Sequence, residues 1–310
     1  MKKVIVIVGP TAIGKTALSL DIAQMFNGEI ISGDSMQVHV GMDIGTAKIL
    51  PNEMKSIPHH LIDCIQPDEP YTVAQFQTDV RQCIEDIHER AHVPIIVGGS
   101  GLYIEAALYN YTFSEQKRDD TFTKNMEKVI KEKGIEPLFD RLKNVDPEHA
   151  AQIHPNNHRK VIRALEVYET TGKTMTESQE EDRQEPLYDI LFIGLEMERP
   201  QLYERINHRV NFMIDEGLID EVEGLLRQGF RAQKSMKAIG YKEIIEYLDG
   251  HVTKEEAIAT LQRNSRRFAK RQYTWFKNRL PVHWYNVTNG LSSEVSEDIN
   301  EDIAGFLKDT

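Results

Sequence analysis

The chain has 310 residues, of which 40% are hydrophobic and 28% are charged, and its formal net charge is −12. This length supports one large domain or two, with a sizeable core. No apolar run approaches the ~20 residues that a membrane-spanning helix needs, and the two cysteines make neither a disulfide framework nor a zinc site. We therefore expect a cytoplasmic protein that does not enter a membrane.

The first motif in the chain is "GPTAIGKT", which follows a strand-like apolar run at 4–8 and precedes a segment with helical spacing. The pattern G-x-x-x-x-G-K-[ST] in this context is typical of a P-loop, whose backbone N–H groups and lysine hold phosphate oxygens while the threonine offers a hydroxyl to Mg²⁺. ATPases, kinases and transferases that release diphosphate all use such a loop. The predicted diphosphate-binding residues are Gly9, Pro10, Thr11, Ala12, Ile13, Gly14, Lys15 and Thr16, with Thr16 as the metal contact.

Strand-like and helical segments alternate over residues 1–115. Strands are expected at 4–8, at 29–32 and in "VPIIVGG", and helices at 15–26, at 72–90 and after "GGSGLY". This order is typical of a parallel sheet with helices on its faces. The sequence therefore predicts an α/β fold of the P-loop NTPase type.

Residues 116–187 differ from this pattern because they are charged, helical in spacing and free of strand-like runs. The apolar run at 189–197 suits a return to the buried parallel sheet. Helices are then expected at 200–228, 235–248 and 254–278, followed by an acidic amphipathic tail from about 293. We predict a catalytic core of residues 1–115 and 188–310, interrupted by an all-helical insertion domain of residues 116–187.

Positive charge is concentrated in two helical segments, although the chain is acidic. The stretch 260–280 contains no acidic residue, and its Arg267 and Arg271 fall on one helical face. A second basic segment, 156–166, carries Arg159, Lys160 and Arg163. Such runs are often only solvated surface, and they also form the phosphate-binding surfaces of nucleic-acid-binding proteins; the sequence leaves both interpretations open.

Asp34 is the one carboxylate at the end of an early predicted strand. The strand in "PIIVGG" ends in two glycines, where P-loop ATPases typically have the aspartate that holds Mg²⁺. A carboxylate at the carboxyl edge of a parallel sheet, beside a phosphate loop, lies where open α/β folds bind their ligands. Asp34 is therefore a candidate general base, and a contact to Mg²⁺ through water or a turn-capping role are the alternatives.

A set of motifs in fixed order covers almost the whole chain: "GPTAIGKT", "SGDSMQVHVGMDIGTAK", "PHHLID", "VGGSGLY", "RALEVYETTGK", "KAIGYKE" and "FAKRQYTWFKN". In these motifs the chain resembles the bacterial tRNA dimethylallyltransferases. The resemblance implies transfer of a dimethylallyl group from dimethylallyl diphosphate to N6 of adenosine 37, in tRNAs that read codons beginning with U. It also implies Mg²⁺ as the cofactor and diphosphate as the released product.

The resemblance also implies roles for single residues. Asp34 corresponds to the general base of the family, and Arg209 to an arginine that binds diphosphate, with the neighbouring Arg205 as the alternative. Thr11 and Ser100 are expected to position the diphosphate or the base. The predicted catalytic residues are thus Asp34, Thr11, Ser100 and Arg209. Ser100 stands where the family often has threonine, so the hydroxyl is kept and the methyl group is not.

An adenine within a stacked loop must be flipped out of the stack before an enzyme can act on it. We expect the pocket that receives it to be lined by Asp34, Ser35, Met36, Gln37 and Ser100. The amide of Gln37 suits the edge of adenine. Further tRNA contacts are predicted at Arg159, Lys160, Arg163, Lys237, Lys242, Arg267 and Arg271. The aromatic residues Tyr273, Trp275 and Phe276 fit a helix core better than a stacking role.

Other functions are compatible with parts of this pattern. A small-molecule kinase would place ATP at the P-loop and a hydroxyl acceptor at Asp34. An RNA-binding protein with a relic P-loop is disfavoured by the intact Lys15, Thr16 and Asp34. A relative that modifies free adenine nucleotides would not need the basic segments. For the favoured function we expect the helical insertion to clamp the anticodon stem-loop of the tRNA, and the enzyme to act as a monomer without zinc.

Overall fold

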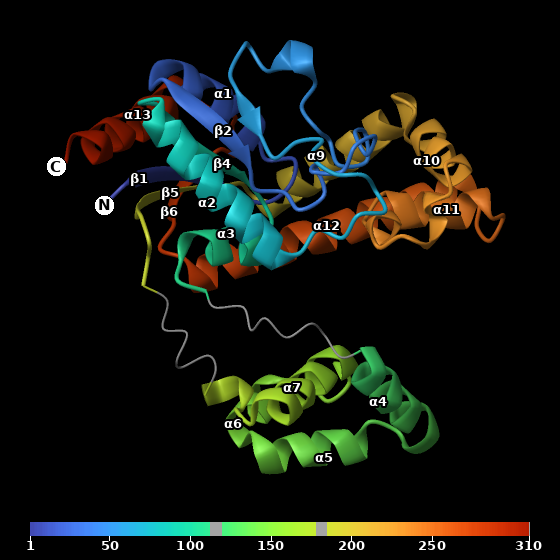
Figure 1. The fold of residues 1–310 in the computed structure, drawn as a ribbon. Helices are drawn as coiled ribbons and strands as arrows, with labels where there is room; N and C mark the ends of the chain where they lie inside the picture. Colours follow the sequence, from blue (N-terminus) through green and yellow to red (C-terminus); the bar gives the residue numbers. More distant parts are fainter. Residues whose placement is uncertain (112–119, 178–184, 310) are drawn as a thin grey trace. The chain divides into compact units, whose positions relative to one another are not determined.

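The computed structural model describes residues 1–111, 120–177 and 185–309. Its contacts divide the chain into a core unit, residues 1–109 with 186–310, and an inserted unit, residues 110–185. Figure 1 shows a sheet flanked by helices in the first unit and helices alone in the second. The predicted start of the insertion at 116, and residues 178–184 near its predicted end, lie outside the described residues.

All pairs of neighbouring strands in the six-stranded sheet of the core unit are parallel, and the strand order is β3-β2-β4-β1-β5-β6. The central strand β1 has five fully buried residues in succession, 4–8, as expected for a parallel sheet covered on both faces. The strands are β1 (Lys3–Val8), β2 (Gly28–Ser32), β3 (His59–His60), β4 (Val93–Gly98), β5 (Asp189–Glu196) and β6 (His283–Asn286). This arrangement confirms the α/β fold that the sequence predicted.

The two faces of the sheet pack against different helices because neighbouring residues of β1 point in opposite directions. Ile5 and Ile7 belong to a core with residues of α1 (Lys15–Met25), α9 (Arg199–Asp215) and α13 (Ser293–Lys308). Val4 and Val6 belong to the opposite core, with residues of α2 (Val73–Glu89), α3 (Gly101–Leu108) and α12 (Lys254–Arg279). Figure 1 shows this three-layered order.

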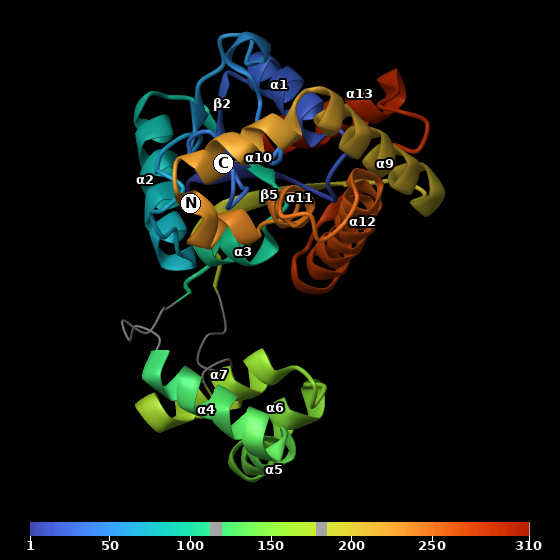
Figure 2. The same ribbon diagram turned by 90° about the vertical axis from the view of Figure 1, so that its right-hand side faces the viewer.

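The predicted helix at 200–228 is two helices, α9 and α10 (Leu218–Arg227). The break lies at Gly217, which adopts a left-handed conformation with φ of +100° that residues other than glycine rarely take. The predicted helix at 235–248 begins as a 3₁₀ turn (Ser235–Lys237) and continues as α11 (Tyr241–Leu248). Figure 2 shows α9, α10, α11 and α12 gathered at one side of the core unit.

Two strands were missing from the sequence prediction. Strand β3 has only two residues, too few to show an alternating pattern, and it pairs with β2 at one edge of the sheet. Strand β6 lies in the C-terminal third, which the sequence predicted to be entirely helical; it pairs with β5 at the other edge. Both are stabilised by pairing with a neighbouring strand rather than by a pattern of their own.

The inserted unit has its own small core, formed by Leu138, Leu142, Val161 and Leu165 with their neighbours. Its helices are α4 (Asp120–Lys133), α5 (Glu136–Val145), α6 (Pro147–Gln152) and α7 (His158–Thr171). Residues 120–177 contain helices and connecting turns but no strand, in agreement with the helical pattern of the sequence. Among the described residues of the two units, no helix is long and apolar enough to cross a membrane.

Candidate active site

The P-loop connects β1 to α1 and borders a cavity of about 390 Å³, here called the P-loop cavity. The ammonium group of Lys15 donates to the carbonyl oxygens of Gly9 and Pro10, at 3.0 and 2.8 Å. The pKa of Lys15 is lowered to about 7, chiefly by burial and also by the nearby Arg209, while Asp34 opposes the shift. Lys15 is therefore held on its own loop, in an environment that favours an anionic partner.

A second cavity of about 330 Å³ adjoins the P-loop cavity. Five of the predicted site residues line the second cavity and not the P-loop cavity: Ser35, Met36, Ser100, Lys237 and Arg271. Both cavities are lined by Thr11, Ala12, Asp34, Thr46, Arg209 and Phe268. A group bound at the P-loop and a group bound in the second cavity would therefore meet at Asp34.

Asp34 lies just after β2, and its Oδ1 accepts the backbone N–H of Met36 at 2.9 Å. The turn-capping role considered above is thus present. It does not exclude a chemical role, because the same side chain lines both cavities. Burial raises the pKa of Asp34, and the Met36 N–H and the charges of Lys15 and Arg209 partly oppose this rise. A higher pKa makes the ionised carboxylate a stronger base.

Arg209 extends from α9 to the P-loop, where its guanidinium donates to the hydroxyl of Thr11 at 3.1 Å. It lines both cavities, whereas Arg205 is exposed and lines only the P-loop cavity. Of these two arginines, Arg209 therefore lies at the junction with Asp34. The sequence had left this choice open.

Sequence reasoning missed Gln272, a buried residue of α12 that joins two loops of the site. Its Oε1 accepts the backbone N–H of Thr11 at 2.9 Å, and its Nε2 donates to the carbonyl oxygen of Gly99 at 3.1 Å. The sequence contains a signal for this residue, because the apolar Ala269 and Phe276, three residues before it and four after, share its helical face. In the structure both are fully buried. A buried amide on such a face requires partners.

Ser100 fixes the turn that follows Asp34. Its hydroxyl oxygen accepts the N–H of Ser35 at 3.1 Å, and its own N–H donates to the carbonyl oxygen of Gly33 at 3.2 Å. Gln37 differs from Ser35 and Met36 because it lines the P-loop cavity and not the second one. The turns after β2 and β4 thus meet beside Asp34.

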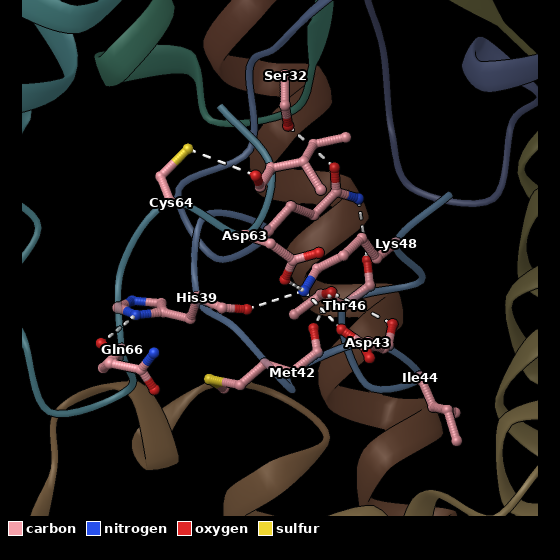
Figure 3. A network of polar contacts seen from close by, with 12 residues as sticks. Ser32, His39, Met42, Asp43, Ile44, Thr46, Lys48, Asp63, Cys64 and Gln66 are labelled. Carbon is pink, nitrogen blue, oxygen red and sulfur yellow. Dashed lines mark hydrogen bonds and ion pairs between the residues drawn. The ribbon is translucent and has the colours of Figure 1, made fainter. Parts of the chain in front are cut away.

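The amide of Gln37 is engaged within the protein. Ser32 donates to its Oε1 at 2.9 Å, and its Nε2 donates to the carbonyl oxygen of Thr46 at 3.2 Å. Figure 3 shows Ser32 and Thr46 within one polar network, in which Lys48 also lies. The contact with adenine predicted for Gln37 would have to replace at least one of these bonds.

The predicted tRNA-binding cations fall into groups with different surroundings. Arg267 and Arg271 are exposed on α12 and line an open groove. Lys242 lies 3.6 Å from the carboxylate of Glu243. Of the three aromatic residues considered for stacking, Trp275 lines this groove, whereas Tyr273 donates to Glu196 at 2.6 Å and Phe276 is fully buried.

In the inserted unit, Arg159 and Lys160 are exposed at the start of α7. Arg163 on the same helix forms an ion pair of 2.8 Å with Glu166, whose side chain is only 3% exposed. Two of these three cations are therefore surface charges, whereas the third also compensates a buried carboxylate.

Comparison with known proteins identifies the family. The sequence model described as IPP transferase matches residues 37–279 of this chain. The chain is 55% identical over 306 residues to a tRNA dimethylallyltransferase of Oceanobacillus iheyensis, an alignment that covers 99% of this chain and 98% of that relative. The chain belongs to the IPP transferase family. Its members transfer a prenyl group, and this chain is accordingly a prenyltransferase.

Solved structures of the family agree with this fold. The tRNA isopentenylpyrophosphate transferase of Bacillus halodurans is 48% identical, with a TM-score of 0.76, covering 99% of this chain and 97% of that one. A eukaryotic dimethylallyltransferase acting on tRNA is 31% identical, with a TM-score of 0.83, covering 98% of this chain and 80% of that one. The family thus supplies a reaction class for the two adjoining cavities.

The residues present fit Mg²⁺. Thr16 is in the first turn of α1 and lines the P-loop cavity together with Asp34. Among the described residues, no group of three or more histidine, cysteine, aspartate or glutamate side chains could hold a metal ion. Mg²⁺ typically takes only one or two protein ligands and completes its shell with water and substrate phosphates. A single hydroxyl beside a diphosphate site matches that preference.

Proposed function

We propose that this chain transfers a dimethylallyl group from dimethylallyl diphosphate to N6 of adenosine 37, in tRNAs that read codons beginning with U. The observation that carries this proposal is that the P-loop cavity and the second cavity meet at one carboxylate, Asp34. A donor held by its diphosphate and an acceptor base entering from the other side would be brought together there. The names of the relatives, tRNA dimethylallyltransferases, support the same reaction.

The P-loop side of the site would stabilise the leaving group. As the donor C1–O bond breaks, its electron pair stays with the diphosphate, so positive groups aimed at that diphosphate lower the barrier. Lys15 and Arg209 lie at this cavity, and Arg209 is bonded to the Thr11 hydroxyl. Mg²⁺, when bound beside Thr16, supplies further charge neutralisation to the diphosphate.

Asp34 would take the proton of the acceptor. A bond forms from N6 of adenine to C1 of the donor, and N6 then gives its proton to the carboxylate of Asp34. The lone pair of N6 is delocalised into the ring, so removal of the proton as the bond forms contributes to the rate, typically by ~10²- to 10⁴-fold for general-base catalysis. The raised pKa of Asp34 suits this role.

The exposed cations would bind the RNA backbone. Arg267 and Arg271 on α12 and Lys237 at the second cavity are suited to phosphates near the flipped nucleotide. Arg159 and Lys160 give the inserted unit a basic helix start, suited to the anticodon stem. We further propose that the protein acts as a monomer in the cytoplasm, where its tRNA substrate and a phosphorylated donor are both found.

The proposal is tested by transfer of label from dimethylallyl diphosphate, with Mg²⁺ and without ATP, to unmodified tRNA, with AMP as a competing acceptor. We expect label in the tRNA and none in AMP. Label in AMP would change the acceptor to a free nucleotide. An absence of transfer, together with ATP consumption in the presence of a small hydroxyl acceptor, would favour the kinase instead.

A further inference from the structure

The motifs "GMDIGTAK" and "KAIGYKE" take no part in the bond-making step above. Both contact Glu221 of α10. The carboxylate of Glu221 accepts three consecutive backbone N–H groups, those of Asp43, Ile44 and Gly45, at 3.0, 2.7 and 3.1 Å. Successive N–H groups that converge on one anion form a backbone nest. Here the anion is a side chain from a helix that follows the nest by almost 180 residues along the chain.

Tyr241, the first residue of α11, completes this arrangement. Its hydroxyl donates to Glu221 Oε1 at 2.7 Å, and the residue is fully buried. Burial and the neighbouring Glu221 raise the pKa of Tyr241, so the hydroxyl stays protonated and can donate. A Cβ atom at Gly45 would come within 2.5 Å of the Tyr241 ring, so only glycine allows this approach.

Lys48 fixes the same segment from its other end. Its side chain is only 3% exposed, and its ammonium group donates to the carbonyl oxygen of His39 at 2.8 Å and to Asp43 at 2.6 Å, and also bonds to Asp63. Figure 3 shows Lys48 among these three partners, with Thr46 and Met42 beside them. Displacing this buried cation from its carboxylate partners is costly, because the ammonium group would then be a buried charge without compensation.

The segment held in this way is a wall of the site. Gly45 lines the second cavity, in which Asp34 also lies, and Thr46 lines both this cavity and the P-loop cavity. The carbonyl oxygens of Thr46 and Ala47 accept the Gln37 amide, at 3.2 and 3.4 Å. The nest at 43–45 therefore sets the place of the residues that border the cavity directly after it.

We propose that Glu221 is a positioning residue for the acceptor: its carboxylate holds residues 43–46 as a wall of the second cavity and ties that wall to α10 and α11. Glu221 does not line either cavity, so it acts through the backbone of this segment. The inference rests on the proposed function, because that function makes the second cavity the acceptor site. It predicts an effect on the RNA substrate that the diphosphate donor does not share.

The test is Glu221→Gln in the full chain, with Glu223→Gln as the matched control. Glu223 lies on the same helix and forms an exposed ion pair with Arg227, so its loss changes the same charge away from the nest. An amide cannot accept all three N–H groups as an anion does, and loss of such charge-assisted bonds typically changes an equilibrium ~10-fold or more. For Glu221→Gln we expect kcat/KM for unmodified tRNA to fall by about tenfold, with the donor Kd measured without RNA unchanged. We expect the control to behave as the wild type does.

The same experiment separates positioning from stability. A purely structural role would lower the melting temperature and the fraction of active enzyme, leaving KM for tRNA unchanged, and that result would overturn the inference. An equal loss in donor binding and in kcat/KM for tRNA would overturn it as well. Where Glu221→Gln does not fold, Tyr241→Phe decides: it removes one bond to Glu221 and keeps the nest. A smaller fall in kcat/KM for tRNA with an unchanged donor Kd supports the inference, and an unchanged kcat/KM refutes it.

Failure of the proposed function would be recognised before any variant is measured, because the wild type would then transfer no label to tRNA. An active wild type with a normal Glu221→Gln variant would leave the proposed function intact and remove only the positioning role. The two claims thus fail by different results.

Discussion

The two walls of the site are built in opposite ways. The P-loop wall comes from consecutive residues, 9–16, and Lys15 is bonded to carbonyl groups of that same loop. The facing wall, residues 34–47, is held by two side chains that are distant in the sequence, Ser100 after β4 and Glu221 on α10, and by the buried Lys48 that directly follows it. The loop at the diphosphate site is thus local in the sequence, with Arg209 and Gln272 as its distant partners, whereas the wall on the acceptor side depends on the tertiary fold throughout.

The largest effect should come from Asp34, which lies in the facing wall and lines both cavities. In Asp34→Asn, the amide can still cap the turn at Met36 but cannot accept a proton from N6. We expect the rate in single-turnover transfer to fall by ~10²- to 10⁴-fold, with the Kd of both substrates nearly unchanged. Asp21→Asn, which changes an exposed aspartate paired with Lys55, is the matched control. A wild-type rate for Asp34→Asn would show that another group takes the proton.

Gln272→Leu should disturb the P-loop wall, because Gln272 joins the P-loop to the turn after β4. The substitution leaves the N–H of Thr11 and the carbonyl oxygen of Gly99 without their side-chain partner. Unsatisfied buried groups cost about 1–3 kcal/mol each, so we expect the free energy of unfolding to fall and donor binding to weaken about tenfold. Denaturant unfolding and donor titration measure the two effects. Gln262→Leu on the same helix, bonded to Asn211 near the surface, should show neither.

The P-loop wall alone should carry a pH dependence in donor binding. The pKa of Lys15 is lowered to about 7, so the free enzyme loses the ammonium charge as the pH rises through this value. Bound diphosphate favours the charged form and raises this pKa, so the donor Kd should increase by up to about tenfold per pH unit above 7. Lys15→Arg is the control: the donor ionises in the same way with both enzymes, but the arginine keeps its positive charge. Equal pH profiles for wild type and Lys15→Arg would show that Lys15 is charged throughout this range.

The smallest effect should come from the cations outside both walls. Arg267→Ala removes one exposed charge from the groove on α12. We expect a severalfold loss of tRNA affinity and a decrease of ~0.7–0.9 in the slope of log K against log salt. Lys277→Ala, in which a lysine paired with Glu196 is lost, serves as the comparison and should leave the slope unchanged. An unchanged slope for Arg267→Ala would place the RNA elsewhere.

The sequence predicted the local features of this protein well. The P-loop, the strand β1 before it, the helix α1 after it and the helix α12 depend on patterns within a few residues, and all are present. The same is true of Asp34, whose place after a strand puts it at the edge of the sheet. The division into α9 and α10 at Gly217 was not predicted, because a glycine alone does not end a helix: Gly224 lies inside α10.

The features that the sequence did not predict depend on pairing over long distances. Strand β6 is held by β5, and no periodicity of its four residues distinguishes it from a helix end or a loop. Glu221 occurs in an ordinary amphipathic helix, and nothing in that helix indicates that its carboxylate meets residues 43–45. Gln37 was assigned to the adenine because of its amide, whose bonds within the loop become visible only in the fold.

The central claim is that a donor at the P-loop and an adenosine in the second cavity meet at Asp34. It is tested most directly by incubating the enzyme with dimethylallyl diphosphate, Mg²⁺ and an unmodified anticodon stem-loop, without ATP, and mapping the product by mass spectrometry of its nuclease fragments. The account predicts one dimethylallyl group, on the base of nucleotide 37. A dimethylallyl group on any other nucleotide, or hydrolysis of the donor without transfer to RNA, would contradict it.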